Sequence, residues 1–172
     1  MNMKKVSLVM VLSMILLASC NSTGKFDKNL KEAHKEMGIT FYASVLMTSD
    51  IAKAWQEAIY DNRTPSGKYC RDFNDALEEV MTQKGFLIDS INAHKNKLAS
   101  ATSKLNNPPS DRKDCYNDFI ELVSEVNSYA NLATSPSGSL RSYSENKNIS
   151  YTKVMKLMDQ FKIKYGEYIK EE

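Results

Sequence analysis

Two serine–lysine pairs have a spacing that could support nucleophilic catalysis. Ser110 and Lys113 stand three residues apart, as do Ser144 and Lys147, and this is the spacing at which a lysine activates the serine of Ser–Lys acyl-enzymes. The partner motifs of those enzymes are absent from the sequence, and the chain is rich in both serine and lysine. Chance is therefore the better explanation, and a hydrolase built on Ser110 and Lys113 or on scattered carboxylates is the weakest of three functional hypotheses.

The two histidines give no metal-binding pattern. A di-iron bundle needs Glu-x-x-His pairs, but Lys31 stands three residues before His34 and Ile91 stands three residues before His94. No zinc cluster, calcium loop or phosphate-binding glycine loop occurs in the sequence. We expect His94 to be a hydrogen-bonded residue at the core boundary and His34 to be solvated. The sequence thus predicts no catalytic residue, no metal site and no cofactor.

The most informative cysteine is Cys20, which follows an apolar run. Lys4 and Lys5 precede the apolar segment Val6–Leu17, which is shorter than the roughly 20 residues of a membrane span and is typical of a secretory signal peptide. Leu17-Ala18-Ser19-Cys20 resembles the lipobox of bacterial lipoproteins. The resemblance implies that the Cys20 thiol receives a diacylglycerol and that the peptide bond before it is cut. The alternative is an ordinary signal peptide followed by a chance cysteine.

The lipobox resemblance divides the chain into three parts. Residues 1–19 are the expected signal peptide, residues 20–26 the lipidated cysteine with a short tether, and residues 27–172 a single folded domain. Each buried acyl CH₂ contributes about 0.8 kcal/mol, so two or more chains anchor stably. If extended, the six tether residues after Cys20 reach about 20 Å. We therefore expect a membrane-anchored protein of the cell envelope, on the outer membrane facing the periplasm if the host is Gram-negative.

The two remaining cysteines, Cys70 and Cys115, are candidates for a disulfide because export places them in an oxidising compartment if the host has a periplasm. Two free thiols are the alternative. One straight helix over residues 70–106 would be about 54 Å long and would separate the cysteines, whereas a disulfide needs Cα atoms within about 7 Å. A chain reversal at Gly85 would bring them together. We therefore predict the reversal and the disulfide as a pair.

The charge of the chain excludes some partners. After Cys20 there are 21 acids and 21 bases, because only Lys4 and Lys5 precede it. A neutral domain with interspersed signs argues against binding to nucleic acid. It also argues against electrostatic attachment to a membrane, which the lipid makes unnecessary.

The periodicity of the apolar residues predicts an all-α protein. Apolar residues recur at helical intervals throughout, and no stretch alternates as a strand would. Asp72 and Ser110 are candidate N-caps, and we expect fraying near residues 146–148. The prediction is an antiparallel bundle of four to five helices with a break near Gly85. Its helices cover residues 27–61, 72–83, about 86–105, about 111–133 and about 140–169.

Large apolar side chains raise the second functional hypothesis, a small-ligand carrier. Helical bundles often hold ligands in apolar cavities between helices. The residues that we expect to line such a cavity are Phe41, Trp55, Tyr151 and Met155.

Several short segments resemble those of a loose set of uncharacterised, exported bacterial helical proteins, many of them predicted lipoproteins. The segments are AWQEAIYDN, DFNDAL, NNPPSD and LATSPSGSLRSYS. The resemblance implies an exported helical domain and carries no site residue. The favoured hypothesis is therefore a non-enzymatic, lipid-anchored bundle that binds or scaffolds a protein or peptide partner in the envelope.

Overall fold

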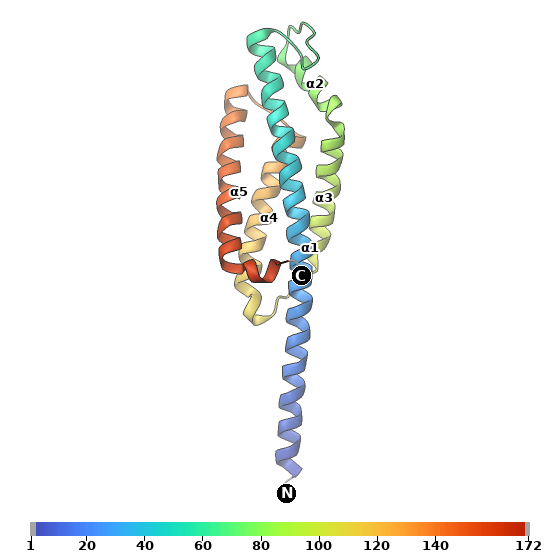
Figure 1. Ribbon diagram of the computed structural model, residues 1–172, viewed down its shortest axis with the longest axis vertical. Helices are drawn as coiled ribbons and strands as arrows, with labels where there is room; N and C mark the ends of the chain where they lie inside the picture. Colours follow the sequence, from blue (N-terminus) through green and yellow to red (C-terminus); the bar gives the residue numbers. More distant parts are fainter. Residues whose placement is uncertain (1–2, 171–172) are drawn as a thin grey trace.

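The computed structural model describes the backbone of residues 3–170 and the side chains of residues 22–170, and this part of the chain is an all-α bundle (Figure 1). The predicted fold class is confirmed. Its only β-type pairing is an isolated bridge between Arg63 and Tyr69. The elements in chain order are α1 (Met3–Asp61), α2 (Phe73–Gln83), α3 (Gly85–Ser103), the short 3₁₀ turn η1 (Ser110–Arg112), α4 (Lys113–Thr134) and α5 (Leu140–Ile169).

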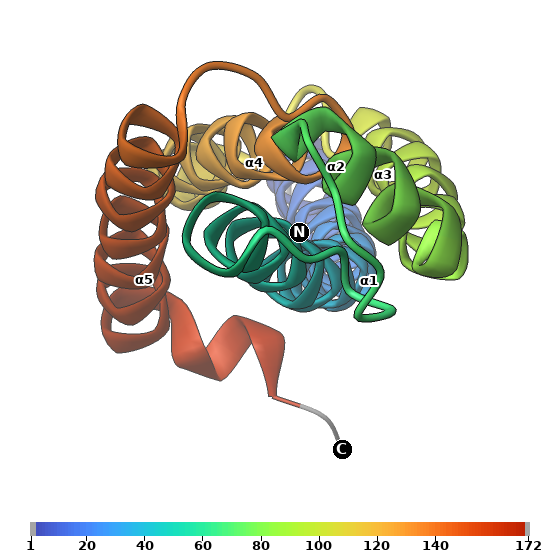
Figure 2. The ribbon, with the colours of Figure 1, turned by 90° about the horizontal axis from the view of Figure 1, so that it is seen from above.

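Helix α1 is the central element and packs against the other four α-helices (Figure 2). Most of its middle is apolar or small and buried, while one side stays open to solvent at Tyr42. Even Thr40, Ser44 and Thr48 are buried there. The Thr40 and Ser44 hydroxyls donate to the carbonyls of Glu36 and Thr40, at 2.8 and 2.7 Å, so these polar groups are satisfied within the helix.

The interior consists of two clusters, one toward each end of α1. We call the end that contains residue 22 and the α3–α4 connection the proximal end, and the end at Asp61 the distal end (Figure 1). The proximal core includes Leu30, Met37, Leu98, Phe119, Val126 and Phe161. The distal core includes Met47, Ile51, Trp55, Val80, Ile91 and Tyr143.

The predicted break near Gly85 is present, but the predicted reversal is wrong. Lys84 alone leaves helical geometry, with φ −104° and ψ 18°, and α3 continues from α2 toward the proximal end (Figure 1). Backbone hydrogen bonds continue across this residue, because the Lys84 N–H donates to the Val80 carbonyl at 2.9 Å and the Leu87 N–H donates to the Lys84 carbonyl at 2.8 Å. A reversal would break these bonds and would remove α2 or α3 from α1, which both of them contact.

The predicted Cys70–Cys115 disulfide is consequently absent. Both cysteines are free and buried. Cys70 belongs to the distal core and Cys115 to the proximal core, as the nearly continuous α2–α3 segment requires.

Other local predictions have mixed outcomes. The Asp72 carboxylate accepts from the Asn74 N–H at 2.9 Å, which confirms it as the N-cap of α2. Ser110 instead begins η1 and makes no side-chain cap. Helix α5 does not fray near residues 146–148, and its geometry deviates only at Tyr165. Over residues 22–170, no helix combines the length and the apolarity that a membrane crossing needs.

Candidate functional site at the distal end

The connection between α1 and α2, residues 62–72, forms an ordered turn that we call the distal loop. Asn62 and Gly67 take left-handed φ values of 53° and 81°, which glycine and asparagine accept most easily. The Thr64 N–H donates to Lys68 at 2.8 Å, and the Cys70 N–H returns to the Asn62 carbonyl at 3.0 Å. The loop therefore has a defined backbone on which side chains can be positioned.

Glu79 of α2 fixes the tip of this loop. Its Oε1 accepts the Ser66 backbone N–H at 2.7 Å and the Gln83 amide at 2.8 Å. Desolvation alone would raise the pKa of Glu79. Hydrogen bonds from Thr64 and Ser66 and the charge of Lys68 outweigh it, so the net effect lowers the pKa. The ionised carboxylate thus holds the loop against α2.

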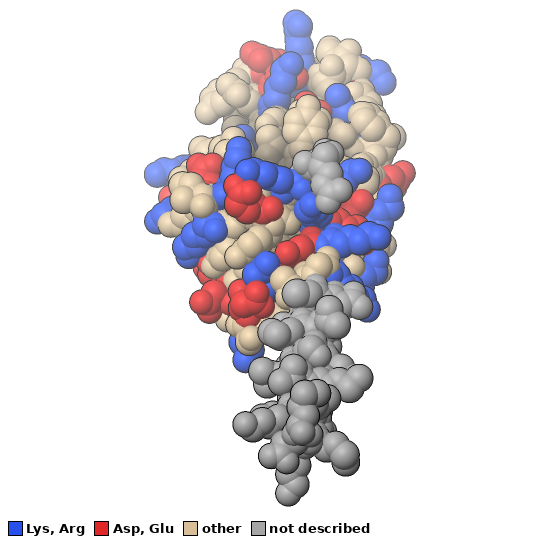
Figure 3. Space-filling model, turned by 60° about the horizontal axis from the view of Figure 1, so that its bottom comes forward, with Lys and Arg blue, Asp and Glu red and all other residues tan. Residues whose placement is uncertain are grey.

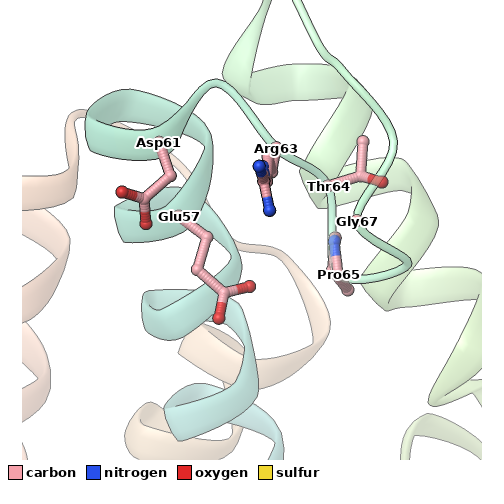
Figure 4. Close-up of a pocket in the computed structure, with 6 residues that line it drawn as sticks. All are labelled: Glu57, Asp61, Arg63, Thr64, Pro65 and Gly67. Atoms are coloured by element: carbon pink, nitrogen blue, oxygen red, sulfur yellow. The ribbon is translucent and has the colours of Figure 1, made fainter.

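A cavity of about 530 Å³ lies between the last turn of α1 and the distal loop (Figure 4). Glu57 and Asp61 stand four residues apart on α1, so both carboxylates lie on the same side of the helix. Arg63, the second residue of the distal loop, lies between these carboxylates and the tip of the loop in this view. The Glu57 carboxylate is 3.7 Å from Lys53 Nζ, an exposed pair that leaves it accessible. The remaining lining residues are Thr64, Pro65 and Gly67.

Exposed aromatic rings accompany the charged groups at this end. Tyr60 is 71% exposed and Tyr69 is 74% exposed. In the distal core, Trp55 is only 1% exposed and packs edge-on against Tyr143, with ring centres 5.0 Å apart. Carboxylates and exposed tyrosine rings are groups that can bind a cationic, partly apolar side chain by ion pairing and cation–π contact.

Sequence reasoning missed Glu57, Asp61 and Arg63. A usable signal was present: two acids one helical turn apart, with an arginine two residues after the second acid and a Pro-Ser-Gly turn after it. It was missed because carboxylates on a helix surface are usually only solvated, and what distinguishes these is the loop that folds back over them.

The four residues expected to line a carrier cavity do not form one group. Phe41 and Tyr151 do come together, with stacked rings 5.8 Å apart. Met155 packs at the edge of the same proximal core. Trp55, however, lies in the distal core. The carrier hypothesis therefore stays a prediction without a common cavity for its residues.

The histidine predictions have opposite outcomes. His94 Nδ1 lies 2.5 Å from Glu36 Oε2, which confirms a hydrogen-bonded boundary residue. His34 is not solvated as expected, since it is partly buried and stacks on Phe161 with ring centres 6.2 Å apart. Burial lowers the pKa of His34.

The remaining candidate residues that the structure describes do not form a catalytic or metal-binding group. Ser110 is exposed at the start of η1, and Lys113 is exposed at the start of α4. Burial raises the pKa of the Cys115 thiol to about 12, so this thiol is a poor nucleophile. Cys20 lies outside the described side chains. Within residues 22–170, no three His, Cys, Asp or Glu side chains are grouped so that they could hold a metal ion.

Comparison with known proteins gives no relative. No protein-family model matches the chain, and no curated protein and no solved structure matches it.

Proposed function

We propose that this chain is a lipid-anchored, non-enzymatic binding protein of the cell envelope that presents its distal end to a peptide or protein partner. The lipobox at Leu17–Cys20 supports the anchor. The observation that carries the proposal is the path of α1, which runs without interruption from the tether to the rim of the distal cavity. From Ser22 to Asp61 this helix spans about 60 Å, so the tether and the cavity are at opposite ends.

The chemistry of the distal end favours a partner segment that carries lysine or arginine. Residues 57–79 contain six acids and three bases, a net charge of −3. Glu57 and Asp61 supply carboxylates at the cavity, and Tyr60 and Tyr69 supply exposed rings beside them in the sequence. A basic side chain would pair with the carboxylates while its aliphatic part packs on a ring.

The anchor is tested by the Cys20→Ser variant. The wild-type protein is expected in the membrane fraction after a carbonate wash, because its acyl chains are buried in the bilayer. The variant is expected to lose the lipid mass from its N-terminal peptide and to be extracted by the wash. A variant that resists extraction to the same degree would contradict the lipid anchor.

The distal binding site is tested by site-specific photo-crosslinking in cells, with the photoreactive residue at Tyr60. The matched control position is Tyr42, which is also an exposed tyrosine of α1 but lies in the middle of the helix. We expect a discrete adduct from position 60 that is absent from position 42 and is lost in the Glu57→Gln/Asp61→Asn background. Adducts of equal intensity at both positions, or an adduct at position 60 that ignores the double substitution, would contradict the site.

The partner class is tested by direct titration of purified protein with a lysine-containing peptide and with the same peptide acetylated on lysine. We expect binding of the first peptide to weaken with rising salt and to fall about tenfold or more on acetylation. Equal binding of the two peptides would contradict recognition of a basic side chain.

A further inference from the structure

A second cavity, of about 300 Å³, lies at the proximal end between residues 22–29 of α1 and the α3–α4 connection. Phe26, which is 4% exposed, contributes an apolar wall with Pro109. The polar residues around this cavity are Ser22, Lys25, Asn29, Lys104, Asn106 and Asn107. These side chains are two ammonium groups, three amides and a hydroxyl, and no carboxylate is among them.

Neighbouring contacts position this set of donors. The Asn29 amide donates to the Lys104 carbonyl at 3.3 Å, which ties α1 to the end of α3. Lys104 Nζ is 3.2 Å from each carboxylate oxygen of Glu32, so its ammonium group is directed toward α1. Asn107 takes a left-handed φ of 61°, which turns the chain sharply at the edge of the cavity.

The charge around this cavity differs from the charge of the chain as a whole. Residues 22–32 and 104–112 together hold five bases and three acids, a net charge of +2. Figure 3, in which this end comes forward, shows basic and acidic side chains interspersed over the surface. All three of these acids are already paired, Asp27 and Asp111 with Arg112 and Glu32 with Lys104. Overall neutrality therefore does not exclude an anionic ligand at this place.

We propose that the proximal cavity binds the phosphate of an anionic phospholipid headgroup, such as phosphatidylglycerol. Phosphate oxygens accept hydrogen bonds from ammonium and amide groups and form their strongest ones with charged donors. Phe26 and Pro109 would contact the glycerol carbons. The proposal rests on the lipid anchor, because Lys25 follows Cys20 by five residues and thus stays within about 8 Å of it if helical or about 18 Å if extended.

The cavity is tested on the full chain in an uncharged maltoside detergent, by two-dimensional NMR of the asparagine side-chain amides. Three probes are titrated: inorganic phosphate, monomeric dihexanoyl phosphatidylglycerol and monomeric dihexanoyl phosphatidylcholine. We expect saturable shifts of Asn29, Asn106 and Asn107 with phosphatidylglycerol, and binding of the zwitterionic lipid and of inorganic phosphate that is at least several-fold weaker.

Matched variants identify the residues responsible. Lys25→Gln/Lys104→Gln is expected to weaken binding of the anionic lipid about tenfold or more. The control is Lys53→Gln/Lys84→Gln, because Lys84 pairs with Asp50 of α1 at 3.2 Å much as Lys104 pairs with Glu32, and Lys53 is an exposed lysine of α1. The control is expected to bind within twofold of wild type.

Three outcomes would overturn the proposal. These are the absence of saturable shifts with phosphatidylglycerol, an equal loss of binding in both variants, and inorganic phosphate binding as tightly as the lipid, which would make the cavity a free-phosphate site. The monomeric lipids need no membrane attachment. A failed lipid anchor, detected by the Cys20→Ser fractionation, is therefore distinguishable from a failed cavity.

Discussion

The two ends of the bundle carry opposite charge, although the chain after Cys20 is neutral. The distal segment 57–79 has a net charge of −3, whereas the two proximal segments 22–32 and 104–112 together have a net charge of +2. The distal end also exposes Tyr60 and Tyr69, while the proximal cavity is lined mainly by amides and lysines. A total charge close to zero thus hides two surfaces that suit different partners.

The ends also differ in what holds them together. At the distal end, a backbone turn is fixed by one carboxylate, Glu79. At the proximal end, Arg112 donates from Nε and Nη2 to the two oxygens of Asp27 at 3.0 and 3.2 Å, and its Cζ lies 3.9 Å from the centre of the Tyr168 ring. Arg112 therefore joins η1 to α1 and α5. We infer that the proximal end is the more rigid of the two.

The largest expected effect is on the reactivity of the Cys115 thiol at the proximal end. The test also follows Cys70, the free cysteine of the distal core. Because burial raises the Cys115 pKa from 9.0 to about 12, its thiolate population at pH 8 falls about 1,000-fold, and native alkylation should slow by a similar factor. Peptide mapping after iodoacetamide treatment measures this rate. After denaturation without a reductant, both Cys70 and Cys115 should be alkylated. Recovery of a disulfide-linked pair of peptides that contain these two cysteines would contradict their placement at opposite ends of the bundle.

The next effect tests whether the two ends unfold together. Phe119→Ala in the proximal core should lower the free energy of unfolding by about 3–5 kcal/mol, because Phe119 is fully buried. Trp55 is the only tryptophan, so its fluorescence reports the distal core alone, while far-UV circular dichroism reports all helices. The substitution should lower the urea midpoint of unfolding by the same amount in both signals. The matched variant is Ile91→Ala in the distal core. If the urea unfolding curve followed by Trp55 fluorescence is the same for Phe119→Ala as for wild type, the two ends unfold independently.

The helices were predictable because their cause is local, whereas the relation between the two ends was not. The apolar periodicity of residues 27–61 and the cap at Asp72 follow from neighbouring residues alone. The path after Lys84 depends on α2 and α3 both packing on α1, which no local signal encodes. The same limitation placed Trp55 beside Phe41 in one expected cavity, because helical spacing identifies a buried face but not which of two cores it enters. The distal cavity depends on the path of the distal loop, and in the sequence Pro65 and Gly67 indicate only that a turn occurs there.

A smaller effect sharpens the comparison of rigidity. Arg112→Ala should lower the free energy of unfolding by about 2 kcal/mol, because it leaves Asp27 without its bidentate partner and removes the contact with Tyr168. Arg112→Lys keeps the charge but loses the planar two-donor geometry, so we expect an intermediate value. Urea denaturation measures both. If the lysine variant equals wild type, charge alone fixes this end.

The smallest effect concerns the distal loop. Glu79→Gln should increase the amide hydrogen exchange of Ser66 several-fold at pH 7 and leave global unfolding nearly unchanged, because the Ser66 N–H donates to the Glu79 carboxylate and the ionised form is the stronger acceptor. The matched control is Glu78→Gln, an exposed neighbour on the same helix. Because hydrogen bonds lower the folded pKa of Glu79 below 4.5, the protection should be complete above pH 4.5 and lost as the pH falls through that lower value. Protection that persists at lower pH, or equal loosening in both variants, would show that the backbone turn alone orders this end.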